Sequence, residues 1–258
     1  MALKYINYNS AMIYSGYAII NSGLGDADTG FEFSKLALKI NEKYDNKEFN
    51  SKVYMIMGGE ISHWKKHAKE DLSYLSNAFQ YGLETGDLVY AGFSLSCIIY
   101  CKTIKGDFLD EIYNDASKYL DFAIRNNQTD IIPIFKTTCL IISELTGSKE
   151  HSRLFPPEEE NALFEQMNNL TMKIPVHWYF LNKMKNLYIL GDYNEAYKFA
   201  LESEKLVEVC FALLQIPEHC FYHSLILAAL YNTVTPEEQG KYLEKMQINS
   251  GKLKFWAD

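Results

Sequence analysis

Proline and the patterns typical of β-strands are both scarce in this sequence. Only 6 of the 258 residues are proline and 14 are glycine, and runs of alternating Val, Ile and Thr are nearly absent. The chain therefore carries few strand signals and few helix breakers. Leu, Ala, Glu and Lys, which favour helices, are common instead. These features predict an all-α fold.

The sequence also lacks a concentration of basic residues and any CxxC pair. Its 25 Lys and Arg residues are scattered and outnumbered by 33 Asp and Glu, for a formal net charge of −8. Because nucleic-acid binding needs a basic face, we expect no nucleic-acid partner. The five cysteines are typical of buried thiols in a reducing compartment. We interpret Cys97 and Cys101, four residues apart on one helix, as packing residues and not a redox pair.

Targeting segments and catalytic motifs are missing as well. The start, MALKYINYNS, has no basic region followed by a long apolar core, and no stretch reaches about 18 uninterrupted apolar residues. We therefore expect a cytoplasmic protein with no membrane partner. No Gly-rich phosphate loop, GxSxG elbow, HRD or DFG triplet occurs. We expect no enzymatic activity in this chain and no cofactor.

A small residue that recurs within apolar, helix-like segments is the first positive feature. Residues 54–61 read YMIMGGEI, and a glycine inside a helix costs about 1 kcal/mol, so it usually lets a neighbouring helix approach. The same pattern surrounds Gly16, Gly58 and Gly92, which lie 42 and 34 residues apart. This spacing is typical of repeated helix pairs. We predict close helix packing at all three glycines.

Short polar segments separate the helix-like stretches, which are about 14 to 20 residues long. Connections this short favour antiparallel neighbours. We predict an α-solenoid of antiparallel hairpins with about 11 to 12 helices, forming a single domain over residues 1–258. Two prolines and several acids mark a candidate lobe break at 146–159. The polar segments lie at 23–30, 45–50, 68–71, 85–87, 105–107 and 126–129.

The last helix has a clear start signal and no stop signal. Thr235, Pro236 and Glu238 form the pattern of a capping box with proline at the first helical position. The final residues, KLKFWAD, contain neither glycine nor proline and leave Phe255 and Trp256 near the end. From this we expect the chain to be part of a longer protein.

Residues 180–203, FLNKMKNLYILGDYNEAYKFALES, resemble a tetratricopeptide repeat. An aromatic residue opens the first helix, Gly191 lies at the turn, and Ala196 and Ala200 lie on the second helix. In that repeat glycine permits a tight turn, and small residues let the two helices approach. The resemblance implies packing roles for Gly191 and Ala196 and a tetratricopeptide-like fold. Met184 departs from the pattern, because the repeat favours a small residue there.

Further stretches resemble the helical-repeat region of very large bacterial signalling proteins. They are residues 28–31 (DTGF) with 36–38 (LAL), 61–67 (ISHWKKH) and 82–92 (GLETGDLVYAG). In that family a serine/threonine-kinase-like domain and an AAA/STAND-type ATPase precede the repeats, and GAF and sensor histidine-kinase domains follow. The likeness runs through most of the chain. It implies a scaffold or sensor arm whose partners are those ATPase and kinase domains, or a peptide or protein ligand.

Two groups of histidines are candidate metal ligands. Glu60 and His63 with His67, and His219 with His223, would place acid and imidazole groups on single helical faces, as di-iron helical bundles do. Such a site also needs carboxylates from two further helices, which the sequence does not assign. Structural roles are therefore favoured, and we expect no metal.

Five side chains are predicted to contact a partner. Tyr17, Tyr54 and Tyr90 lie near the small-residue face, which lines the concave groove in curved repeat arrays. Trp64 and His67 belong to HWKKH, an element that recurs in the resembling family, as a structural clasp or as part of a binding face. We favour a non-catalytic interaction or sensor module. The alternatives are a free-standing tetratricopeptide-type receptor for a peptide signal, and a metal-dependent helical-bundle enzyme.

Overall fold

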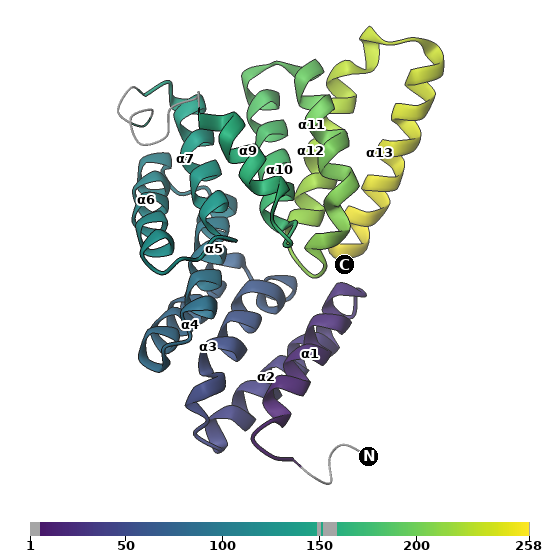
Figure 1. Ribbon diagram of the computed structural model, residues 1–258. Coiled ribbons are helices and arrows are strands. Elements are labelled where there is room, and N and C mark those ends of the chain that lie inside the picture. The colour runs from purple at the N-terminus through teal and green to yellow at the C-terminus, as the bar shows by residue number, and fades with distance from the viewer. Residues whose placement is uncertain (1–5, 149–150, 152–158, 258) are drawn as a thin grey trace. The chain divides into compact units, whose positions relative to one another are not determined.

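The structure is a computed structural model that describes residues 6–148, 151 and 159–257. In these residues the chain forms twelve α-helices and no strand (Figure 1). The predicted all-α class is confirmed. The contacts between residues divide the chain into two parts, which we name unit 1 (residues 1–132) and unit 2 (residues 133–258). Each unit has a hydrophobic core of its own.

Within unit 1, neighbouring helices along the chain pack against one another, most extensively α1 on α2 and α4 on both α3 and α5. The core joins Ala11 and Tyr14 of α1 to Ala37 and Ile40 of α2 and Val53 of α3. The α-helices are α1 (Ser10–Gly23), α2 (Ala27–Lys43), α3 (Lys47–Ile56), α4 (Asp71–Thr85), α5 (Leu88–Lys105) and α6 (Leu109–Arg125). A π-helix, η2 (Met57–Ile61), and two 3₁₀ turns, η3 (Ser62–Trp64) and η4 (Ala68–Glu70), connect α3 to α4.

Unit 2 repeats this sequential packing, with α10 on α11, α11 on α12 and α12 on α13. The capping box predicted at the start of α13 is confirmed, because Thr235 N–H and Oγ1 both donate to Glu238 Oε2, at 3.1 and 2.8 Å. The elements are α7 (Ile132–Thr146), α9 (Glu160–Asn168), α10 (Ile174–Leu190), α11 (Tyr193–Leu206), η6 (Val207–Cys210), α12 (Gln215–Leu230), η7 (Tyr231–Thr233) and α13 (Pro236–Ala257).

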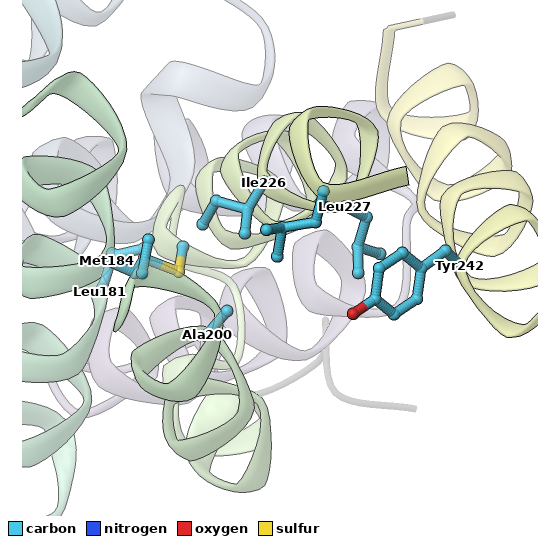
Figure 2. Packing of buried hydrophobic residues seen from close by; sticks show 8 residues of the cluster. Leu181, Met184, Ala200, Ile226, Leu227 and Tyr242 are labelled. Carbon is cyan, nitrogen blue, oxygen red and sulfur yellow. The ribbon is translucent and has the colours of Figure 1, made fainter. Parts of the chain in front are cut away.

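The core of unit 2 combines large side chains with two fully buried alanines of α11, Ala196 and Ala200. Because an alanine side chain is a single methyl group, these positions let α10 and α12 pack closely on α11. The side chains drawn in Figure 2 come from four consecutive helices: Leu181 and Met184 from α10, Ala200 from α11, Ile226 and Leu227 from α12, and Tyr242 from α13.

Glycine–aspartate pairs connect consecutive helices at four places. Each glycine has a left-handed backbone conformation, with φ between 76° and 96°, at or just after the end of a helix. At three of the pairs the aspartate carboxylate then accepts a hydrogen bond from the backbone N–H three residues later and begins the next helix. The glycines are Gly25, Gly86, Gly106 and Gly191, and the three capping residues are Asp26, Asp87 and Asp192.

Close approach at glycine occurs at Gly58 and Gly92 but not at Gly16. A Cβ added to Gly58 would lie 2.9 Å from Tyr74 Cβ, and one added to Gly92 would lie 1.7 Å from Gln128 Oε1. At Gly16 and at Gly191 a Cβ would meet no atom within 4 Å. The close packing predicted for Gly16 is therefore wrong, because Gly16 faces open space. Gly191 has a left-handed backbone with φ 85° at the end of α10, as the predicted turn requires.

The candidate lobe break at 146–159 largely lies outside the described residues, because 149–150 and 152–158 are not among them. The division by contacts falls earlier, between residues 132 and 133. The single-domain assignment stays a prediction.

One described helix, α5, is long and apolar enough to match a membrane-spanning segment by length and composition. Core helices of folded domains meet the same criteria. Helix α5 packs against α4 and α6 and buries Ala91, Leu95 and Ile99 almost completely. These contacts account for its apolar sequence within unit 1.

Candidate functional site

The three tyrosines predicted to bind a partner lie on α1, α3 and α5 of unit 1. Tyr17 is 56% exposed, and its ring packs on that of Phe33, with centroids 5.3 Å apart. Tyr54 is half-buried against Tyr81, and burial raises the pKa of its hydroxyl to about 12. The ring of Tyr90 lies beneath the Lys52 ammonium, 5.6 Å away. Each tyrosine thus has a different neighbour inside unit 1.

Trp64 and His67 lie in the connection between α3 and α4. The Trp64 indole N–H donates to the carbonyl oxygen of Glu60 at 3.1 Å, and its ring packs beside that of His63. His67 is exposed, and its Nδ1 accepts the Lys69 N–H at 3.1 Å, which caps the turn η4. Both residues therefore hold this connection together, as the clasp interpretation of HWKKH predicts, and their binding role stays a prediction.

The glycine pair at 58–59 belongs to the π-helix η2, which inserts a wider turn at the end of α3. Gly58 lies against α4, and a Cβ on Gly59 would lie 3.0 Å from the Cys97 sulfur of α5. The absence of side chains at both positions thus lets the π-turn pack directly against two helices. The π-turn also moves Glu60 and His63 out of the α-helical register on which the metal-site hypothesis relied.

A buried group of acid, imidazole and thiol side chains adjoins this π-turn. The Asp71 carboxylate is fully buried at the start of α4. Its Oδ2 lies 3.4 Å from His63 Nδ1 and accepts the Cys101 thiol at 3.9 Å. The other oxygen, Oδ1, has no hydrogen-bond partner within the described part of the chain. Asp71 therefore connects η3 to α5 through polar contacts inside unit 1.

Burial favours the protonated forms of the neighbouring groups in this region. It raises the pKa of the Glu60 carboxyl to about 7. Burial, with smaller contributions from the Glu60 and Asp71 charges, raises the pKa of the Cys97 thiol to about 12. Burial also raises the pKa of Cys101 far above its ordinary value. Because the thiolate is the reactive form of cysteine, neither thiol has the properties of a nucleophile.

Unit 2 contains a second buried polar group, which connects three helices and η6. The Ser203 hydroxyl of α11 lies 3.2 Å from His177 Nε2 of α10 and 2.9 Å from His219 Nδ1 of α12. The other nitrogen of His177, Nδ1, lies 3.2 Å from the Cys210 sulfur. All four side chains are at most 3% exposed. We name this chain of contacts the serine–histidine network.

The hydrogen bonds of the serine–histidine network admit two proton arrangements. In the first, Cys210 donates to His177 Nδ1, His177 Nε2–H donates to Ser203, and Ser203 donates to His219 Nδ1. In the second, every donor and acceptor is exchanged, so that His219 donates to Ser203 and His177 donates to Cys210. Both arrangements satisfy the three hydrogen bonds with neutral imidazoles.

Three histidines of unit 2 are kept neutral by burial. It lowers the pKa of both His177 and His223 to about 4. The pKa of His219 falls to about 2, first because of burial and then because of the nearby His223, His177, Lys245 and Lys252. The rings of His219 and His223 lie 5.3 Å apart, and His223 Nδ1 has no hydrogen-bond partner within the described segments. His219 and His223 thus form buried packing contacts on α12.

The sequence identified part of these two buried groups. It singled out Glu60, His63 and the pair on α12, but it missed Asp71 and three members of the serine–histidine network. A polar residue inside an apolar stretch, such as the histidine in IPVHWYF at 174–180, was the available signal. Over the residues that the structure describes, no three His, Cys, Asp or Glu side chains come together in a geometry suited to a metal ion. The members of the serine–histidine network that the sequence analysis missed are His177, Ser203 and Cys210.

We compared the sequence with known protein families and with curated proteins. Neither a scan against models of protein families nor a search of curated proteins finds a match. The resemblance to the repeat region of bacterial signalling proteins stays a prediction from the residues that carry it.

Proposed function

We propose that this chain is a non-catalytic helical-repeat module that mediates protein–protein or intramolecular interaction. One observation carries the proposal: within each unit, helices pack mainly against their neighbours in the chain. This sequential packing supports a solenoid, because in a solenoid every repeat touches only adjacent repeats. Solenoids act in general as binding scaffolds, because stacked repeats build extended surfaces.

The finer form of the proposal is a tetratricopeptide-like α-solenoid of antiparallel hairpins. Two features support it: the short glycine–aspartate turns between helices, and the small residues where α10, α11 and α12 meet. A short turn forces the next helix to run back along the previous one.

The chemistry of the buried groups supports a structural and not a catalytic role for them. The Cys210 thiol is 0% exposed, and burial raises its pKa to about 12. It therefore stays protonated and out of reach of a substrate, although it lies beside His177 as the nucleophile of a cysteine hydrolase would. The serine–histidine network accordingly holds α10, α11, α12 and η6 together.

The biological setting that we propose is a bacterial signal-transduction kinase or ATPase, in which this module relays the binding of a ligand to neighbouring ATPase and kinase domains. The resemblance carried by residues 28–31, 36–38, 61–67 and 82–92 supports this setting. On this proposal the catalytic domains lie outside the present chain.

Binding to those domains tests the proposal directly. The purified chain is titrated by calorimetry with the ATPase and kinase-like domains encoded in the same reading frame, and its own ATP hydrolysis is measured in parallel. We expect saturable binding and no hydrolysis. Tyr90→Ala should weaken the binding, whereas Tyr193→Ala in unit 2 should leave the binding unchanged.

Two results would contradict the proposal in different ways. ATP hydrolysis in proportion to the amount of chain would end the non-catalytic interpretation. A reading frame without ATPase or kinase domains, combined with a peptide that raises the melting temperature, would favour the free-standing peptide receptor.

A further inference from the structure

A pocket of about 500 Å³ lies along one side of α2 in unit 1. Its volume is in the range of pockets that hold small ligands or a few side chains of a peptide. Phe33 and Leu36 line it with apolar surface. Beside them, four charged side chains follow one another along a single helical face: Asp28, Glu32, Lys35 and Lys39. We name this pocket the α2 groove.

The apolar side of the α2 groove is held in place by the core of unit 1. The Phe33 ring stacks on that of the buried core residue Tyr14, with centroids 5.7 Å apart and 14° between the ring planes. Leu36 is partly buried against the same core. The ring of Tyr17, a predicted partner contact, also packs on Phe33. An apolar side chain of a partner therefore meets a preformed surface, which lowers the entropic cost of binding.

The acids of the α2 groove already have cationic partners, whereas two lysines beside them do not. Asp28 Oδ1 lies 2.8 Å from Lys65 Nζ, and Glu32 Oε1 lies 2.6 Å from Lys35 Nζ. Lys39 and Lys66 have no ion-pair partner in the part of the chain that the structure describes. Two positive charges thus remain for a ligand, in a chain whose net charge is −8.

The ring of Phe31 holds Lys66 against α2. The Lys66 ammonium lies 5.4 Å from the centre of this ring, and the Lys35 ammonium lies 5.2 Å from the same centre. The ring attracts both cations, but the two like charges repel each other. A bound anion would offset this repulsion.

The connection that carries Lys65 and Lys66 is itself ordered by its neighbours in HWKKH. Trp64 donates to the Glu60 carbonyl oxygen, and His67 accepts the Lys69 N–H, on either side of the two lysines. The clasp residues and the charged side chains are therefore different members of the same segment. This arrangement presents the lysines in a defined place.

We propose that the α2 groove binds an acidic peptide segment of a partner protein. The inference rests on the proposed function, because it names the kind of partner that the interaction module takes. Phe31, which holds Lys66, and Lys39 are eight residues apart, or about 12 Å along the helix axis. Four residues of an extended peptide span about 13 Å, so two acids spaced four apart reach both lysines.

The peptide also needs an apolar residue midway between its two acids. In an extended chain every second side chain points to the same face, so this residue and both acids face the groove together. It then lies on Phe33 and Leu36. Nucleic acid has closely spaced phosphates and no such side chain, and anionic membranes are recognised by larger clusters of basic residues.

A labelled model peptide tests this pattern. It carries two glutamates four positions apart and a leucine midway between them, with alanine, glycine and serine elsewhere. Fluorescence anisotropy with the full chain should show saturable binding with a dissociation constant in the micromolar range, which rises as salt is added. Replacing both glutamates with glutamine, or the leucine with serine, should raise the constant about fivefold or more.

Three results would overturn the proposal. One is the absence of saturable binding up to millimolar concentration, and another is equal binding of the three peptides. The third is displacement of the peptide by an equal concentration of inorganic phosphate or of phosphatidylserine vesicles, because the groove would then accept any anion.

Lys39→Gln and Lys66→Gln separate binding from folding. Both side chains are exposed, so the melting temperature should change little. The dissociation constant of the model peptide should rise about five- to tenfold in each variant, because one charged contact is lost. Lys118→Gln is the matched control, since Lys118 lies on α6 and its side chain is 74% exposed. Equal constants for the three variants would refute the groove.

Reversing the charges tests the two-point arrangement. Lys39→Glu and Lys66→Glu should each prevent binding of the diacid peptide. A peptide with lysine in place of its first glutamate should restore binding to one variant, and a peptide with lysine in place of its second glutamate should restore binding to the other. Rescue of both variants by the same peptide, or of neither by any, would reject the arrangement.

The glutamine variants also distinguish this inference from the proposed function. They are titrated with the neighbouring ATPase and kinase-like domains under the same conditions. Saturable binding of these domains that neither variant weakens would refute the α2 groove and leave the interaction module intact. Peptide binding without any binding of the domains would support the groove and contradict the proposed setting.

Discussion

Single polar side chains connect helices that are far apart in the sequence. Ser203 contributes one hydroxyl to two imidazoles, on α10 and on α12. Lys183 of α10 donates to Glu144 of α7 at 2.7 Å and pairs with Glu160 of α9 at 3.0 Å. A buried polar group that loses its partner is expensive, since no water replaces the lost hydrogen bond. Removal of either side chain should therefore destabilise unit 2.

Replacing Ser203 with alanine leaves a nitrogen of His177 and one of His219 without a partner. We expect unit 2 to lose about 1 to 3 kcal/mol of unfolding free energy. Urea denaturation of the variant and of Thr85→Ala provides the comparison, because Thr85 is exposed and bonds only the carbonyl of Tyr81 in its own helix. Equal midpoints for the two variants would show that the serine–histidine network contributes nothing to stability.

Replacing Lys183 with alanine leaves two carboxylates together without their cation. Breaking a buried ion pair in this way typically costs about 3 to 5 kcal/mol, and the 11% exposure of the lysine side chain favours the lower end. Lys198→Ala is the matched control, since its pair with Glu195 lies on the surface. Thermal melting should show a large loss for the first variant and almost none for the second. Similar melting temperatures for the two variants would contradict a stabilising role of Lys183 and its two carboxylates.

At the scale of elements, the same local pattern has two outcomes. Gly16 in α1 and Gly58 at the end of α3 both follow a small or flexible residue within an apolar segment. Gly58 lies in a π-turn against α4, whereas Gly16 faces open space. The difference depends on which helix lies opposite.

Replacing each of these two glycines with alanine and measuring the stability of unit 1 tests that difference. At Gly58 the new Cβ would be 2.9 Å from Tyr74 Cβ and 3.0 Å from the Asp71 carbonyl oxygen, and neither atom is the end of a flexible side chain. We expect Gly58→Ala to destabilise unit 1 by about 1 to 3 kcal/mol. Gly16→Ala should stabilise it by about 0.5 to 1 kcal/mol, because alanine favours a helix and meets no clash. Unfolding curves that shift in the same direction would contradict this account.

On the scale of the whole molecule, the two units should respond to pH in opposite directions. In unit 1 the Glu60 carboxyl has its pKa raised from 4.5 to about 7. Between these values the folded state holds a proton that the unfolded state has released, so this contribution to stability declines as the pH rises. In unit 2, His177 and His223 have pKa values lowered from 6.5 to about 4. There the unfolded state binds more protons, so stability is complete above pH 6.5 and declines as the pH falls toward 4.

Variants that keep only Trp64, which lies in unit 1, or only Trp178 and Trp256, which lie in unit 2, let tryptophan fluorescence follow the two units separately. Between pH 6.5 and 4, each buried histidine should lower the stability of unit 2 by up to about 1.4 kcal/mol per pH unit. Glu60→Gln should remove the pH dependence of unit 1 and leave that of unit 2 intact. Parallel pH profiles of the two units in the parent chain would refute the opposing signs.

The sequence by itself determined the all-α class, most helix ends and the capping box at Thr235, because these depend on residues a few positions apart. A left-handed glycine, an aspartate cap or a proline at the first turn acts on its own backbone. The glycine–aspartate turns were likewise readable: three of the four lie in the polar segments predicted at 23–30, 85–87 and 105–107, and the fourth is the turn at Gly191.

Only the tertiary structure decided which of these residues meet. The π-turn forms where two glycines lie between α4 and α5, and Ser203 joins histidines 26 residues before it and 16 residues after it. Gly16 and Gly58 differ for the same reason. The local sequence indicates the conformation that one segment prefers. Packing also depends on the surface of a second segment that is distant in the sequence, so no single stretch of sequence determines the contact between them.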